Sequence, residues 1–154
     1  MKDYRDKVAV ITGAGRGIGR GIALHCAKEG MKVVLAGFGM ESLTKTAADL
    51  EALGAETLIV QTDVSQVEQV ENLAAATVEA FGQVDLLVNN AGVAQPGKTL
   101  EITLDDWNWV MGVNFYGVLY GVRAFVPRMI KREQPSHVVN VSSQAGVNPG
   151  SGSY

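Results

Sequence analysis

Four glycines, each two positions apart, follow a short apolar stretch near the N-terminus. The stretch 8–11 is mostly β-branched and predicts a buried strand, which ends at Thr12, and an apolar helical period starts at Ile18. The glycines between them are Gly13, Gly15, Gly17 and Gly19. Glycine suits such a turn because it allows positive φ and a close approach of ligand to backbone. A strand, a glycine turn and a helix N-terminus in this order can bind a phosphate through backbone N–H groups.

The spacing of the glycines decides which of the known phosphate-binding patterns this chain matches. The dinucleotide fingerprint G-x-G-x-x-G does not fit, because its third glycine would fall on Ile18 or Arg20. The phosphate-loop pattern G-x-x-x-x-G-K also fails, because Ile18 occupies its second glycine position. The pattern that fits is T-G-x-x-x-G-x-G, carried by Thr12, Gly13, Gly17 and Gly19. A glycine-rich turn without a ligand remains the alternative at this point.

Composition and length indicate a single globular domain. The 154 residues are 47% hydrophobic and 19% charged, which excludes a disordered chain. The net charge is −3 and no basic patch stands out, so nucleic acid is not expected as a partner. No signal-peptide core and no apolar run of roughly 18 residues is present, so we expect a cytoplasmic protein without a membrane partner. The single Cys26 is expected to be a buried thiol.

Beyond the first helix, strand and helix patterns alternate. Apolar runs predict strands at 32–36, 56–61, 84–88 and 136–142. Apolar residues at helical spacing predict helices at 43–53, 67–81 and 110–131, with Ser65 capping the second and Pro127 bending or breaking the third. Thr103, with Asp106 three positions later, is expected to cap a further short helix. This alternation predicts an α/β fold with a doubly wound parallel sheet.

The polar and glycine-rich segments all follow ends of expected strands. Besides the glycine turn they are Asp63, the segment 89–92, Ser142 and Ser143. In a parallel sheet these ends meet at one edge, where ligands bind near the switch point. Their shared edge predicts a binding site there.

With these motifs the whole chain resembles the short-chain dehydrogenase/reductase family. The resemblance rests on the segment 12–19, Asp63-Val64, 85–92, Val113-Asn114, 139–143 and Tyr154. It implies a Rossmann fold with strand order 3-2-1-4-5 and one NAD(P)-binding domain over residues 1–154. It also implies an oxidoreductase that transfers a hydride between a nicotinamide cofactor and a small alcohol or carbonyl substrate. No metal is implied.

The resemblance implies three catalytic residues: Asn114, Ser143 and Tyr154. Hydride transfer to a carbonyl creates an alkoxide that needs a proton, and a tyrosine hydroxyl can supply it if its pKa, normally about 10, is lowered. The family serine, which hydrogen-bonds the substrate oxygen, maps to Ser143, with Ser142 as the other candidate. The interval from Ser143 to Tyr154 is two residues shorter than is common in the family. Asn114 matches the asparagine that distorts a helix and supports a proton relay.

The cofactor-binding residues that the resemblance implies are Thr12, Gly13, Gly15, Arg16, Gly17, Ile18, Gly19, Asp63, Val64, Asn89, Asn90, Ala91 and Gly92. Asp63 is expected to accept from the adenine amino group. NAD-preferring members often carry an acid at the end of the second strand, and residues 36–38 supply none. Arg16 can pair with a 2′-phosphate, so we expect NADP, with NAD as the alternative.

The chain ends at Tyr154, and the family lysine that lowers the tyrosine pKa would follow four residues later. We therefore expect the N-terminal portion of a dehydrogenase, truncated at its C-terminal side and inactive alone, with its fifth strand at an open edge. A nucleotide-binding module without turnover, or an interaction protein, are the alternatives. The helix from Val110 onward is apolar nearly all round, which predicts burial on more than one side. The family uses this helix for dimers, so a homo-oligomer is expected.

Overall fold

The five expected strands form one parallel sheet in the order β3-β2-β1-β4-β5. The computed structural model describes residues 3–144, and Tyr154 lies outside them. The strands are β1 (Val8–Thr12), β2 (Lys32–Gly37), β3 (Thr57–Gln61), β4 (Leu86–Asn89) and β5 (His137–Asn140). The parallel doubly wound sheet and its strand order confirm the expectation from the alternating pattern. The fifth strand is shorter than its apolar run predicts, and its four residues are exposed at the edge of the sheet.

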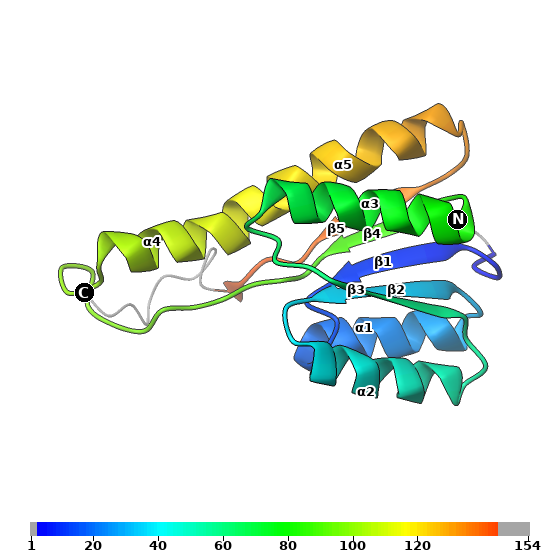
Figure 1. Ribbon diagram of the computed structural model, residues 1–154, viewed down its shortest axis with the longest axis horizontal. Coiled ribbons are helices and arrows are strands. Elements are labelled where there is room, and N and C mark those ends of the chain that lie inside the picture. The colour runs from blue at the N-terminus through cyan, green and yellow to red at the C-terminus, as the bar shows by residue number, and fades with distance from the viewer. Residues whose placement is uncertain (1–2, 145–154) are drawn as a thin grey trace.

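Helices cover both faces of the sheet (Figure 1). They are α1 (Gly17–Lys28), α2 (Met40–Glu51), α3 (Val67–Phe81), α4 (Leu104–Met111), a π-helical turn (Gly112–Tyr116) and α5 (Gly117–Lys131). Figure 1 shows α1 and α2 on one face and α3 and α5 on the other. Strand side chains alternate between these two cores. In β1, Ala9 and Ile11 join the core under α1 and α2, whereas Val8 and Val10 join the core under α3 and α5.

The π-helical turn joins α4 and α5 into one helical run that extends beyond the carboxyl ends of the strands (Figure 1). The capping box predicted for α4 is present, since Thr103 and Asp106 each bond the other's backbone. Pro127 does not break α5, which continues to Lys131. The expected burial of this run on several sides is wrong for the described chain. Its sheet-facing side, with Val113 and Phe125, is buried, but the opposite side is exposed.

Two further expectations about helix ends are corrected. Gln66, not Ser65, precedes the first turn of α3, because the Ser65 hydroxyl bonds Asp63 instead of the helix backbone. Helix α2 ends at Glu51, so Leu53 falls outside the apolar period and is exposed. Among the described residues, none of the helices combines the length and apolar character that crossing a bilayer requires.

The amino ends of β1 and β4 are joined by a buried carboxylate. Asp85 is fully buried and accepts hydrogen bonds from the Val8 N–H at 2.9 Å and from the Gln83 side chain at 2.9 Å. Its other oxygen lies 3.1 Å from Arg132 and 3.4 Å from Lys7. Buried charges are tolerated when they are paired and hydrogen-bonded in this way. Asp85 therefore fastens the sheet to the end of α5, at the edge opposite the glycine turn.

Candidate nucleotide-binding site

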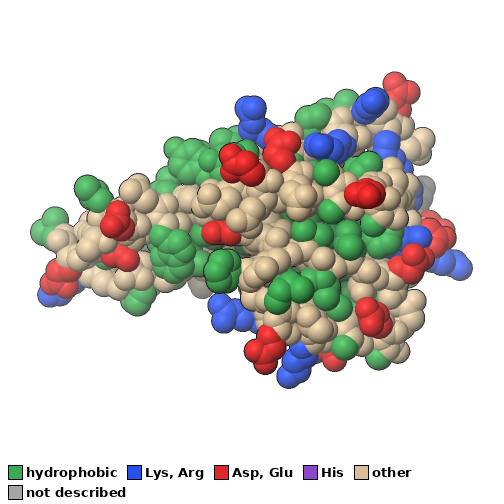
Figure 2. Space-filling model, viewed as in Figure 1, with side chains coloured by type: hydrophobic (Ala, Val, Ile, Leu, Met, Phe, Trp, Pro, Cys, Tyr) green, Lys and Arg blue, Asp and Glu red, His purple; other side chains and the backbone are tan. Residues whose placement is uncertain are grey.

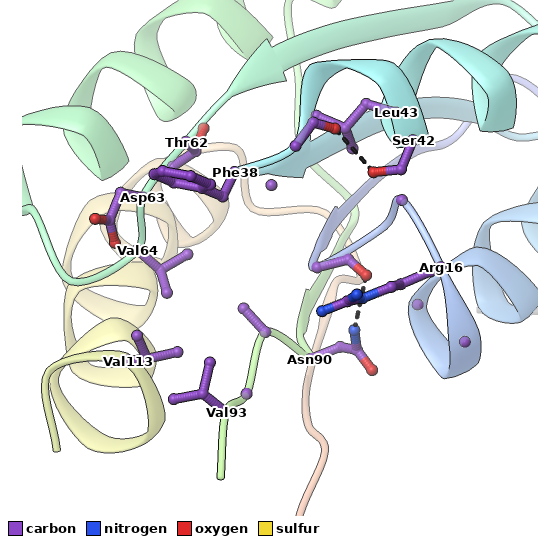
Figure 3. Close-up of a pocket in the computed structure, with 18 of the residues that line it drawn as sticks. Arg16, Phe38, Ser42, Leu43, Thr62, Asp63, Val64, Asn90, Val93 and Val113 are labelled. Carbon is purple, nitrogen blue, oxygen red and sulfur yellow. Dashed lines mark hydrogen bonds between the residues drawn. The ribbon is translucent and has the colours of Figure 1, made fainter. Parts of the chain in front are cut away.

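A cavity of about 870 Å³ opens at the carboxyl ends of the strands. Its walls come from four strand ends and from the helical run above them (Figure 3). The lining residues are Gly13, Gly15–Gly19 with Arg16 and Ile18, Gly37–Gly39 with Phe38, Ser42, Leu43, Thr62, Asp63, Val64, Asn90–Val93, Trp109 and Val113. Segments separated by up to about a hundred positions thus meet at one edge, as the shared strand ends predicted.

The glycine turn has no room for side chains where it packs and is open where a ligand would approach. A Cβ at Gly19 would overlap the Gly13 carbonyl oxygen, and one at Gly15 would overlap the Ser42 hydroxyl. Gly17 has a φ of +55°, and a Cβ there would meet no atom within 4 Å. Glycine is therefore required at two positions by packing and at Gly17 by backbone conformation. The result is a cradle lined by backbone.

The N-terminus of α1 faces this cradle, and no side chain in the described part of the chain caps it. Arg16 precedes the helix and makes no side-chain cap, and no acidic residue lies in the first turn. The first N–H groups of a helix lack intrahelical partners and carry partial positive charge. In α4, by contrast, Thr103 and Asp106 satisfy these groups. The α1 N-terminus fits an anionic group such as the pyrophosphate of a dinucleotide.

Thr12 does not line the cavity, although the resemblance implies a binding role for it. Its side chain is buried and its hydroxyl accepts from the N–H groups of Asn90 and Ala91, at 2.9 and 3.0 Å. The same hydroxyl donates to the Val88 carbonyl. The Asn90 amide donates to the Thr12 carbonyl at 2.8 Å and lies 3.4 Å from the Gly13 carbonyl, and Figure 3 draws the bond to Gly13 beside Arg16. Thr12 thus fastens the segment after β4 against the glycine turn and shapes the cavity indirectly.

Asp63 follows β3 and lines the cavity where that strand ends. Its Oδ1 accepts from the Ser65 backbone at 3.0 Å and from the Ser65 hydroxyl at 2.7 Å. The Asp63 N–H donates to the Gln69 side chain at 2.8 Å. Both side-chain bonds use Oδ1, so none of the described residues bonds Oδ2, which can accept from a ligand. Arg16 and Asp63 are the charged side chains among the lining residues, one at each side of the cavity (Figure 3).

Two asparagines of the predicted site bond to neighbouring strands and loops and do not line the cavity. Asn114 lies in the π-helical turn, and its side chain accepts from the Val93 N–H at 2.9 Å and donates to the Val93 carbonyl at 2.8 Å. Asn89 is buried and donates to Asn140 on β5 at 2.9 Å. Asn114 therefore holds the segment after β4, and Asn89 holds β5. A local distortion of the helix is present at Asn114, as the resemblance implies for this residue.

Of the two remaining catalytic candidates, Ser143 and Tyr154, only Ser143 lies within the described residues. Ser142 and Ser143 follow β5 and are exposed. Tyr154 lies outside the described residues. The cavity also includes residues that the sequence analysis missed: Phe38, Ser42, Leu43, Thr62, Val93, Trp109 and Val113. Phe38 and Thr62 directly follow strand ends, which was a usable signal, whereas the position of Trp109 depends on how α4 crosses above the sheet.

Comparison with known proteins agrees with this geometry. The family model described as short chain dehydrogenase matches residues 7–154. The crystal structure of a short chain dehydrogenase/reductase from Burkholderia phymatum in complex with NAD is 50% identical, covering 96% of this chain and 52% of that one, with a TM-score of 0.93. A metagenomic short-chain oxidoreductase in complex with NADP is 35% identical, covering 95% of this chain and 66% of that one, with a TM-score of 0.90.

A curated relative extends the match to the whole chain. The CLA biosynthesis dehydrogenase/reductase of Lactiplantibacillus plantarum is 39% identical over 156 residues, covering 100% of this chain and 54% of the relative. The chain spans about half the length of this relative and of the NAD-bound structure. The match over residues 7–154, together with the glycine cradle and the sheet order, shows that the chain belongs to the short-chain dehydrogenase/reductase family of oxidoreductases.

Proposed function

We propose that this chain binds a nicotinamide dinucleotide across the carboxyl edge of its sheet and belongs to an enzyme that interconverts alcohols and carbonyls. One observation carries the proposal: the uncapped, acid-free N-terminus of α1 opens onto a glycine turn whose packing excludes side chains. This arrangement provides backbone donors for a pyrophosphate. The relatives in complex with NAD and with NADP support the same ligand class.

The cofactor, when bound, supplies or accepts the hydride. In this proposal the residues of the chain orient the reacting groups and move the proton. Ser143 holds the substrate oxygen by a hydrogen bond, and the Tyr154 hydroxyl exchanges a proton with it. Asn114 acts through the segment after β4, because both of its hydrogen bonds go to Val93. Asp63 accepts a hydrogen bond from the adenine amino group through Oδ2.

We propose NADP as the preferred cofactor. Residues 36–38 offer no carboxylate that would bind the ribose hydroxyls or repel a 2′-phosphate. Arg16 is exposed at the mouth of the cavity, and the described residues give it no ion pair. A guanidinium in that position can form charge-assisted hydrogen bonds with a phosphate.

Titration with NADPH and NADH tests the binding proposal. Nicotinamide fluorescence is followed as each cofactor is added to the 154-residue chain, after circular dichroism has verified its fold. Saturable enhancement by both, with tighter binding of NADPH, is the expected result. A folded chain that changed the fluorescence of neither cofactor would refute the dinucleotide site.

We also propose that the protein is a homo-oligomer through the helical run α4–α5. Apolar side chains recur every four residues on its exposed side: Trp107, Met111, Phe115 and Leu119. Figure 2 shows apolar side chains along the α4 part of the run, where it extends past the sheet. Exposed apolar patches of this kind mark protein interfaces. Sedimentation equilibrium should give a dimer or larger, and Phe115→Asp with Leu119→Asp should give a monomer.

A further inference from the structure

Helix α2 carries a polar stripe on the side that faces α1 and the glycine turn. The stripe consists of Ser42, Thr46 and Asp49, whose spacing of four and three residues places them along one side of the helix. Asp49 pairs with Arg20 in the first turn of α1 at 2.7 Å. Figure 1 shows α1 and α2 side by side on one face of the sheet. The stripe therefore fastens α2 to the beginning of α1.

The stripe meets the glycine turn at Gly15. A Cβ at Gly15 would overlap the Ser42 hydroxyl, so the backbone of the turn lies directly against α2. Figure 3 shows Ser42 facing the loop that carries Arg16. One helical turn further along, the Thr46 hydroxyl donates to the Ser42 carbonyl at 3.0 Å and to the Gly15 carbonyl at 3.3 Å. Thr46 is fully buried, so both of these contacts are shielded from solvent.

A second buried threonine shows what distinguishes Thr46. Thr77 in α3 is also fully buried, and its hydroxyl donates to the Leu73 carbonyl, four residues earlier, at 2.7 Å. Such a bond within the same helix is enough to satisfy a buried threonine hydroxyl. Thr46 makes the corresponding bond at the longer distance of 3.0 Å, because its single proton is shared with the Gly15 carbonyl. The contact with the glycine turn is thus additional to what burial alone requires.

The direction of the Gly15 carbonyl determines the direction of the next backbone donor. The peptide between Gly15 and Arg16 is trans, so its N–H points opposite to its carbonyl and away from α2. Both residues line the cavity, and Arg16 immediately precedes α1. Because glycine leaves the backbone free to rotate, this peptide plane keeps one orientation only if another group holds it. Rotation of the plane would redirect a donor of the cradle.

We infer that Thr46 is a positioning residue for phosphate binding: its hydroxyl holds the Gly15 carbonyl and thereby keeps the Arg16 N–H in the orientation that a phosphate needs. The inference rests on the proposed dinucleotide site. Thr46 does not line the cavity, so it acts through Gly15 and not on the cofactor itself. Binding of ligands that carry a phosphate should therefore depend on the hydroxyl of Thr46, whereas stability should depend on its buried methyl group.

Two substitutions separate the hydroxyl of Thr46 from its methyl group. Thr46→Val keeps the shape and removes the hydroxyl, so NADH, NADPH and ADP should each bind about fivefold more weakly, and adenosine, which has no phosphate, should bind as before. Thr46→Ser keeps the hydroxyl and should retain wild-type affinity for all four probes, although the lost methyl group lowers its urea midpoint. Nicotinamide fluorescence follows NADH and NADPH, and competition with NADPH follows ADP and adenosine. Thr46→Ala differs from Thr46→Ser by the hydroxyl alone, so this pair gives the same comparison if valine unfolds the chain.

Thr77→Val is the matched control, because it removes a buried hydroxyl with the same bond inside a helix, away from the cavity. It should bind all four probes as the wild type does. A wild-type chain that bound no probe would overturn the dinucleotide site and this inference together. Unchanged ADP affinity in Thr46→Val, equal losses for ADP and adenosine, or equal losses in Thr77→Val would overturn the role of Thr46 and leave the dinucleotide site intact. Weakening confined to the probes that carry phosphate, and absent from Thr46→Ser, is the result that supports the inference.

Discussion

The two edges of the parallel sheet bring together distant residues in opposite ways. At the amino edge, Asp85 is fully buried, and both of its oxygens are taken up by hydrogen bonds and ion pairs within the chain. At the carboxyl edge, the N-terminus of α1 has no side-chain cap and no acidic neighbour, and its glycine turn opens onto a cavity.

The difference identifies which edge is available for a ligand. Polar groups at the amino edge are satisfied internally, so that edge contributes to stability. At the carboxyl edge, the described residues give the N-terminus of α1 no side-chain cap, and helix N–H groups without a partner are costly unless water or a ligand bonds them. Variants at the amino edge should therefore change unfolding and leave binding intact, whereas variants at the carboxyl edge should change binding more than unfolding.

The largest effect on stability is expected from Asp85→Ala. Removing one partner of a buried ionic cluster leaves the others uncompensated and typically costs about 3–5 kcal/mol. Urea unfolding should report this loss, and the fraction that stays folded should bind NADPH with unchanged affinity. Asp49→Ala is the control, because Asp49 pairs with Arg20 at 2.7 Å on the surface and should lose less than about 1 kcal/mol. Similar losses from both variants would contradict a special role for the buried carboxylate.

At the carboxyl edge, the strongest test compares two glycines of α1. A Cβ at Gly19 would overlap the Gly13 carbonyl oxygen, so Gly19→Ala must displace the glycine turn and should abolish dinucleotide binding. Overpacking of this kind costs about 1–3 kcal/mol in stability. A Cβ at Gly21 would meet no atom within 4 Å, so Gly21→Ala should raise stability by about 0.5–1 kcal/mol through helix propensity alone. Normal binding by Gly19→Ala would exclude the turn as the phosphate site.

The sequence predicted the open edge better than the closed one. The four glycines at positions 13 to 19 indicate a tight turn between a strand and a helix, because glycine is the residue that such a turn needs. Asp85 begins the segment 85–92 on which the resemblance rests, but nothing in its neighbourhood along the chain points to Arg132, which lies 47 positions away. Long-range ion pairs carry no local pattern, so they become visible only when the fold is known.

The helices show a second limit of prediction from sequence. An apolar helical period does not indicate whether a side chain is covered by the core, by a ligand or by another protein. Ile18 begins the apolar period of α1, yet its side chain is exposed and lines the cavity. Phe115 and Leu119 fit an apolar helix, but their side of the helical run α4–α5 has no cover within the described chain. Periodicity detects apolar faces and does not distinguish a core from a ligand site or an interface.

Arg16→Ala tests whether the carboxyl edge also distinguishes NADPH from NADH. Loss of a charge-assisted contact with an exposed phosphate should weaken NADPH binding about tenfold and leave NADH binding almost unchanged. Lys28→Ala removes the same charge at the other end of α1 and is the control for long-range electrostatics. Isothermal titration with both cofactors measures the two affinities. Equal losses for NADPH and NADH would make Arg16 a residue of the turn and not a determinant of cofactor choice.

The smallest effect is expected from Cys26, on the covered face of the same helix. Burial raises the pKa of the Cys26 thiol from its ordinary value of 9.0 to about 11. The folded protein therefore keeps the thiol proton at a pH where the unfolded chain has lost it, so stability should fall as the pH rises through this interval. Between about pH 8 and about pH 10 the loss of stability is about 1 kcal/mol.

Cys26→Ala lacks the titrating group and should lose correspondingly less stability over the same pH range in urea unfolding. The cavity that alanine creates lowers stability by an amount that does not depend on pH, so the difference between the two slopes isolates the thiol. Parallel slopes would mean that water reaches Cys26, and that the covered face of α1 is as open as the end that faces the cavity.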